Sequence, residues 1–156
     1  SIRRQRQMCI RDRYWTMYAE FTDDLVTGNE MIDTQHKELI CKINDLLKSC
    51  EERSNQSGAA RMLNFLADYT EYHFNEEEAL QESINYPGIK EHKEKHEELR
   101  RTVQELHEML TEEEGPTDAF VEKVSEKVRD WLYYHIQTFD RSVAEFKFMR
   151  DNAERI

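Results

Sequence analysis

Histidines and carboxylates recur at helical spacing along this chain, on the same side as the apolar residues. The set consists of His36, His73, Glu77, His92, His96, His135 and Asp140. His73 and Glu77 are four residues apart, as are His92 and His96, so each pair projects from one face of a helix. A single histidine on an apolar stripe is more often a hydrogen-bonded core residue than a ligand. The argument for a site therefore rests on the combination.

Burying this set in one core has a cost that points to metal ions. Burying five imidazoles and two carboxylates would cost several kcal/mol per unpaired charge unless cations compensate these charges. Imidazole and carboxylate donors together favour iron, zinc, manganese or copper over magnesium or calcium, and the lack of cysteine ligands disfavours a structural zinc site. The pattern predicts two metal ions inside the protein. The sixth histidine, His107, has no histidine or carboxylate three or four residues away on its stripe, and we expect it at the surface.

The apolar spacing predicts the helices that would carry these side chains. We expect helices over roughly 30–52, 59–84, 89–113 and 118–139, with a helical continuation through 140–149. Breaks are predicted at 54–58, 85–88 and 115–116, and Thr117 or Asp118 can cap the last helix. Short connections favour an all-α, up-down-up-down four-helix bundle. An extended arm over 14–28 and a short C-terminal helical tail complete this prediction.

One pair conflicts with regular helix geometry. At 100° per residue, His135 and Asp140 would point about 140° apart. We therefore predict a local distortion between them, such as a π-bulge or a helix end.

The first thirteen residues differ in character from the rest. Residues 3–13 contain five arginines and one acid, and show no helical apolar stripe. The run matches the conceptual translation of a tagmentation sequencing adapter, so we interpret 1–13 as an adapter-derived segment and 14–156 as the domain. A basic arm is the alternative. Without these residues the basic count falls from 22 to 17 and the acidic count from 33 to 32, which gives a net charge of -15. On this interpretation an upstream domain could be missing.

The composition of the chain limits the classes of partner that we expect it to bind. An acidic chain disfavours nucleic acid and anionic membrane surfaces, and no run approaches the length of a membrane span. The three cysteines, Cys9, Cys41 and Cys50, show no disulfide-like or C-x-x-C spacing, which favours free thiols and a cytoplasmic location.

Four sequence blocks carry a family resemblance. They are L-V-T-G-N-E-M-I-D-T-Q-H (25–36), H-F-N-E-E (73–77), Y-P-G-I-K-E-H-K-E-K-H (86–96) and W-L-Y-Y-H-I-Q-T-F-D (131–140). In this order and spacing they resemble the signature blocks of bacterial hemerythrins, over about Phe21 to Phe146. Phe21 departs from the tryptophan of many relatives, which affects packing and not ligation.

The resemblance implies a di-iron centre that binds dioxygen reversibly, in storage, delivery or sensing, rather than an enzyme. Two iron ions, cycling between Fe2+ and Fe3+ and bridged by an oxo or hydroxo group, would share Glu77 and Asp140. One iron would take His92, His96 and His135. The other would take His36 and His73 and keep an open position. The resemblance also implies that Leu132, beside Trp131, lines the oxygen pocket, although both would be core residues in any case.

Other functions stay open. A ferritin-like di-iron oxidase is disfavoured, because no glutamate lies three residues before any histidine. A hemerythrin-fold enzyme acting on peroxide or nitric oxide could use the same ligands. A sensor or delivery module would work with a partner enzyme or an upstream domain. A metal-free helical interaction protein is the remaining alternative.

Overall fold

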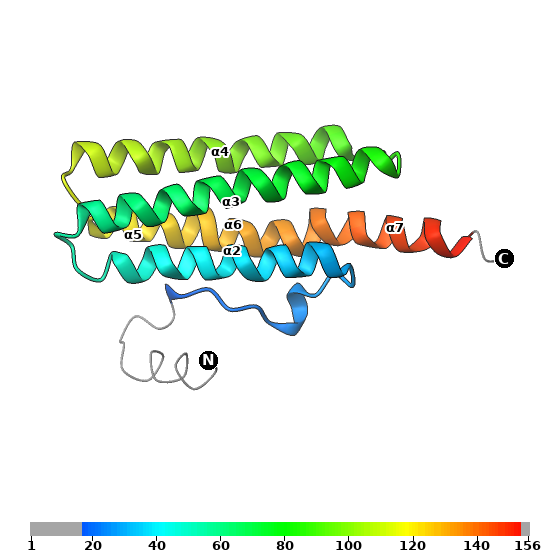
Figure 1. The fold of residues 1–156 in the computed structure, drawn as a ribbon, viewed down its shortest axis with the longest axis horizontal. Helices are drawn as coiled ribbons and strands as arrows, with labels where there is room; N and C mark the ends of the chain where they lie inside the picture. The colour runs from blue at the N-terminus through cyan, green and yellow to red at the C-terminus, as the bar shows by residue number, and fades with distance from the viewer. Residues whose placement is uncertain (1–16, 154–156) are drawn as a thin grey trace.

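Four long helices lie side by side in the computed structural model, which describes residues 17–153 (Figure 1). The first three are α2 (Glu30–Ser49), α3 (Gln56–Ser83) and α4 (Ile89–Glu112). The fourth runs without a break through α5 (Asp118–Val124), η3 (Ser125–Arg129), α6 (Asp130–His135), η4 (Ile136–Asp140) and α7 (Arg141–Ala153). Successive helices run in opposite directions, so the predicted all-α bundle is confirmed.

The helix ends differ from the predicted ones by a few residues. α3 begins at Gln56, inside the stretch predicted as a turn, because the Asn55 side chain accepts a hydrogen bond from the Gly58 amide at 3.1 Å and caps the helix. α2 ends at Ser49, where the Arg53 guanidinium donates to the carbonyl of Cys50 just beyond the helix. Of the two candidate caps for the fourth helix, Thr117 fills the role, since its hydroxyl accepts from the Phe120 amide at 3.1 Å.

The fourth helix is not regular. η3 and η4 are π-helical, with hydrogen bonds that run between residues five apart instead of four. The distortion predicted between His135 and Asp140 is confirmed, because η4 occupies the residues between them. In a π turn, residues five apart lie on one face, which reconciles the two side chains. The sequence did not predict the second π segment, η3.

The core forms two apolar clusters along the bundle. The larger cluster includes Leu46, Leu63, Leu106 and Phe120, and the smaller one contains Ile32, Ile84, Val143 and Ala144. On α3 the apolar spacing predicts an inward stripe that includes Met62, Leu66, Tyr69 and Leu80, and the buried face is broader than this stripe. Leu63 and Phe74 are buried there, whereas Met62 and Leu80 are only partly buried. A helix that packs against neighbours on two sides buries a wide face, which a single stripe underestimates.

The predicted arm is present over the part of it that the structure describes. The chain before α2 runs along the bundle and includes the short 3-10 turn η2 (Asp23–Leu25). Ala19 and the Asn44 side chain exchange two hydrogen bonds, at 2.7 and 2.8 Å, and Leu25 is buried. The segment 1–13, interpreted as adapter-derived, lies outside the described residues.

Within residues 17–153, no helix is both long enough and apolar enough to cross a membrane. Cys41 and Cys50, the two cysteines in this part of the chain, are free thiols.

Replacing Leu106 by alanine should destabilise the bundle. Leu106 is fully buried, so the lost burial and the cavity should lower the free energy of unfolding by about 2–5 kcal/mol. Phe65→Ala on α3 is the control, because Phe65 is 47% exposed and its loss should change stability by no more than about 0.5 kcal/mol. Urea denaturation of both variants measures the difference. Equal effects would contradict the assigned core.

Candidate metal centre

The seven sequence-predicted residues meet in one place inside the bundle. α2 supplies His36, α3 supplies His73 and Glu77, α4 supplies His92 and His96, and the fourth helix supplies His135 and Asp140. Each of the seven is at most 2% exposed. The site lies between the two apolar clusters, with His36 one turn after Ile32 of the smaller cluster and just before Leu39 of the larger one. Four helices thus contribute to one buried, polar layer.

The side chains form two overlapping groups of possible ligands. One group contains Glu77, His92, His96, His135 and Asp140, and the other contains His36, His73, Glu77 and Asp140. Within each group, one donor atom per residue lies within 4.8 Å of every other. Glu77 and Asp140 belong to both groups. Among the described residues, this arrangement offers places for two cations that share two carboxylates.

The first group is centred on His92. Its Nε2 atom lies 2.5 Å from Glu77 Oε1, 2.9 Å from Asp140 Oδ1 and 3.0 Å from His135 Nε2. His135 Nε2 lies 3.0 Å from the same Asp140 oxygen. His96 Nε2 is more distant, 3.8 Å from Glu77 Oε1. All three histidines therefore direct Nε2 toward the carboxylates.

The second group uses the other carboxylate oxygens. His36 Nε2 lies 2.7 Å from Asp140 Oδ2, and His73 Nε2 lies 3.2 Å from Glu77 Oε2. The two imidazole rings meet edge to face, with centroids 4.9 Å apart. Each carboxylate therefore turns one oxygen to each group, the geometry of a bridging ligand.

Unsatisfied polar atoms test whether these residues suit a metal. Several buried donor and acceptor atoms make no hydrogen bond: His36 Nδ1 and Nε2, Glu77 Oε2, His96 Nε2, His135 Nδ1 and both Asp140 oxygens. Buried polar groups are normally paired, because an unpaired one costs about 1–3 kcal/mol. The Nε2 and carboxylate atoms in this set face the centre of the cluster, where a cation would satisfy them together. The donor set therefore fits metal ions.

Two histidines are held from behind by acceptor oxygens at their Nδ1 atoms. His73 Nδ1 lies 2.7 Å from Gln35 Oε1, and His96 Nδ1 lies 2.7 Å from Glu78 Oε2. Such contacts fix the ring and keep the proton on Nδ1, which leaves Nε2 free to bind a metal. The sequence pattern did not predict either partner. Each one neighbours a predicted ligand in the chain, which was the available signal.

Gln81 is a further partner of a site histidine that the sequence did not predict. It is fully buried, and its amide nitrogen lies 3.1 Å from His92 Nδ1 and 3.4 Å from Glu77 Oε1. Gln81 comes four residues after Glu77, so it shares the same face of α3. A polar residue one turn after a ligand was the signal for it.

Aromatic rings enclose the cluster. His135 is stacked between Trp131 and Phe139, with interplanar angles of 11° to both, and Phe74 stacks on His96 with centroids 3.7 Å apart. Leu132, expected to line a pocket, is buried, and Trp131 is partly buried with its indole N–H 3.2 Å from Glu98 Oε2. His107 is not among the site residues and lies beyond the site on α4.

Burial and close charges shift the pKa values in opposite directions. Burial, with the positive charges of His92 and His135, lowers the pKa of His96 to about 2. Burial alone would lower the pKa of His92, but contacts with Asp140 and Glu77 outweigh it and raise the pKa to about 9. Asp140 is buried, which opposes ionisation, yet His135 and His36 hold its pKa well below the usual value. The metal-free site thus keeps carboxylate charge by protonating a histidine.

The fold and the site define a four-helix bundle with a buried histidine–carboxylate cluster suited to two metal ions. A family model described as the hemerythrin HHE cation binding domain matches residues 27–145. The chain therefore belongs to the hemerythrin family.

Relatives and solved structures agree with this assignment. The bacteriohemerythrin of Pseudomonas paraeruginosa is 35% identical over 118 residues, which make up 76% of this chain and 74% of that protein. The bacteriohemerythrin of Aquifex aeolicus is 27% identical over 118 residues, which cover 76% and 88% of the two chains. A crystal structure of wild-type hemerythrin superposes with a TM-score of 0.71 at 26% identity, covering 81% of this chain and 95% of that one. A leucine-to-alanine variant of hemerythrin gives 0.72 at 25% identity.

Metal binding should release protons and strengthen as the pH rises. Below pH 9 or so the metal-free His92 holds a proton that a metal ion must displace, so apparent affinity should rise about tenfold per pH unit for that proton and level off near the pKa of about 9. Anaerobic Fe2+ titrations from neutral pH upward, in two buffers of different ionisation enthalpy, measure both effects. An Fe2+ affinity that does not change with pH over this range would contradict the assignment of a proton to metal-free His92.

Proposed function

We propose that the cluster holds two iron ions and binds dioxygen reversibly. The observation that carries the proposal is the inequality of the two ligand groups. They share both carboxylates, but one group has three histidines and the other has two. Bacteriohemerythrins are among the relatives, which supports iron over the other metals that the same donors accept.

The donor count sets where a small molecule binds. His92, His96 and His135, together with the two shared carboxylates, would hold one iron. His36 and His73, with the same two carboxylates, would hold the other. Because the second group offers one histidine fewer, a small exogenous ligand would bind on that side. The iron pair, when bound, would supply the two electrons that dioxygen takes up on binding and returns on release.

The protein contributes positioning and exclusion of water. Gln35 holds the ring of His73, and Glu78 holds that of His96, each at 2.7 Å, so the donor nitrogens stay aimed inward. Leu132 and the rings of Trp131, Phe74 and Phe139 replace polar surroundings around the histidines. A dry environment slows the irreversible oxidation that would end oxygen carriage.

On this proposal the protein is a binding protein that stores, delivers or senses oxygen. We expect Trp131 and Leu132 to contribute to the oxygen pocket. Turnover of peroxide or nitric oxide at the same irons is the alternative, and the oxygen experiment below separates the two.

The reduced protein should bind oxygen reversibly at two irons per chain. After anaerobic loading with Fe2+, exposure to air should produce visible ligand-to-ferric charge-transfer absorption, and argon should remove it. Metal analysis and repeated spectra on one sample measure stoichiometry and reversibility. Absorption that persists under argon, with steady consumption of peroxide or nitric oxide by a reductant, would favour the enzyme. Absence of bound iron would overturn the site.

Replacing His73 by alanine should damage the oxygen-binding iron selectively. The variant removes one of only two histidines in its group, so oxygen-dependent absorption should be lost and iron should fall toward one per chain. His107→Ala, also on a long helix but outside both ligand groups, is the matched control and should keep the spectrum. Equal spectra from the two variants would refute the assignment of His73.

A further inference from the structure

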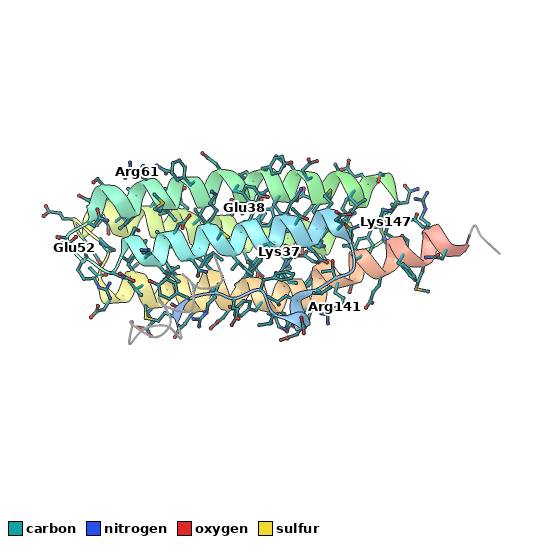
Figure 2. The ribbon with its side chains drawn as sticks, turned by 60° about the horizontal axis from the view of Figure 1, so that its bottom comes forward. Lys37, Glu38, Glu52, Arg61, Arg141 and Lys147 are labelled. Carbon is teal, nitrogen blue, oxygen red and sulfur yellow. The ribbon has the colours of Figure 1, made fainter. Side chains whose placement is uncertain are left out.

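The arm follows the fourth helix in the same direction and is attached to it at three levels. The Arg129 guanidinium donates to the Met17 carbonyl at 2.7 Å, and the Glu20 amide donates to the Tyr133 hydroxyl at 2.8 Å. Farther along, the Arg141 guanidinium donates to the carbonyls of Asp24 and Val26, the latter at 3.3 Å. Figure 2 shows Arg141 beside the turn of the arm. The arm therefore runs from the end of η3 to the end of η4.

Arg141 connects the arm to the distorted part of the helix. Its backbone N–H donates to the carbonyl of Ile136, five residues earlier, and this bond closes the π turn of η4. Its side chain holds η2, the turn of the arm that packs against η4. Asp140, the residue just before Arg141, is one of the two carboxylates that both ligand groups share. One residue thus joins the arm, the π turn and the site.

The π turn needs external support, because it is the less stable alternative. π-helical turns are rare, and α-helical hydrogen bonding is the default for a helix. If η4 relaxed to α-helical bonding, residues at its end would shift by one position, a rotation of about 100° and a rise of about 1.5 Å. Asp140 would then leave the face that His135 occupies. Both ligand groups would lose one of their two shared carboxylates.

Two contacts oppose this relaxation, one on each side of the helix. Toward the interior, Val143 and Ala144 of α7 pack against Ile32 and Ile84, and a shift would expose them. Toward the arm, Leu25 is buried, with 1% of its surface exposed, and the Arg141 guanidinium is tied to two backbone carbonyls. The Arg141 part of the arm contact can be removed without changing any ligand or any residue of the apolar clusters.

We propose that the arm is a positioning element for Asp140: through Arg141 it holds η4 in the π-helical register that presents this carboxylate to both metals. The inference rests on the proposed role of Asp140 as a ligand. It has a reciprocal consequence, because coupling between two equilibria acts equally in both directions. If docking of the arm raises the metal affinity by some factor, metal binding raises the equilibrium constant for arm docking by the same factor.

The reciprocal effect can be measured in the unaltered protein. The amides of Ala19 and Glu20 donate to groups on α2 and α6, so their hydrogen exchange reports on arm docking. Anaerobic loading with Fe2+ should slow exchange at both amides by about tenfold. Amides of α4, such as those near Leu106, lie far from the arm and give the background change. Unchanged exchange at Ala19 and Glu20 in a loaded protein would overturn the proposal.

A matched pair of arginine variants supplies the second test. Arg141→Ala should weaken Fe2+ binding about tenfold and reduce the charge-transfer absorption. Arg129→Ala also removes a guanidinium that donates to an arm carbonyl. Arg129 is the last residue of η3, a segment that carries none of the seven site residues. The Fe2+ affinity of this variant should therefore change less than about twofold. Thermal unfolding of the metal-free variants shows whether any difference merely follows stability.

The outcomes separate this inference from the proposed function. If the unaltered protein binds no iron, the proposed site fails. If it binds two irons and Arg141→Ala binds them with the same affinity, the site stands and the positioning role of the arm is wrong. If both arginine variants lose affinity in proportion to their lost stability, the arm acts only on folding and the positioning role is again wrong.

Discussion

Seven buried polar side chains that need a shared partner impose the constraint on which this structure depends. Nε2 of His92 has two carboxylate oxygens and the Nε2 of His135 within 3.0 Å. No assignment of protons satisfies all of these contacts at once, since one nitrogen carries at most one proton. Two cations at the centre would satisfy them together and offset the loss of hydration. Burial that would be costly for the side chains alone becomes favourable with metal.

Different levels along the bundle supply apolar packing and metal ligands. The larger apolar cluster, with Leu46, Leu63, Leu106 and Phe120, supplies burial that does not depend on any metal. The polar layer lies between that cluster and the smaller one formed by Ile32, Ile84, Val143 and Ala144. Apolar packing on both sides of the polar layer holds the helices in place independently of the metal ligands. The histidines can then be held at distances that their own electrostatics would not select.

The two ligand groups also differ in what lies behind their histidines. His73 contacts a neutral amide, that of Gln35, whereas His96 contacts the Glu78 carboxylate. A carboxylate on Nδ1 gives the imidazole more electron density than an amide does, which makes it the stronger donor. The group with three histidines therefore also has the more electron-rich one. The inequality between the two proposed irons extends beyond the number of ligands.

The sequence by itself predicted the helices, their order and the seven residues that the structure brings together, because 3.6-residue periodicity places side chains on one face of their own helix. It also indicated the distortion between His135 and Asp140, since regular geometry could not bring both inward. Only the tertiary structure decided the partners Gln35, Glu78 and Gln81, the second π segment, and the path of the arm to Arg141. These depend on distances between helices that are far apart in the chain, and periodicity within one helix contains no information about them.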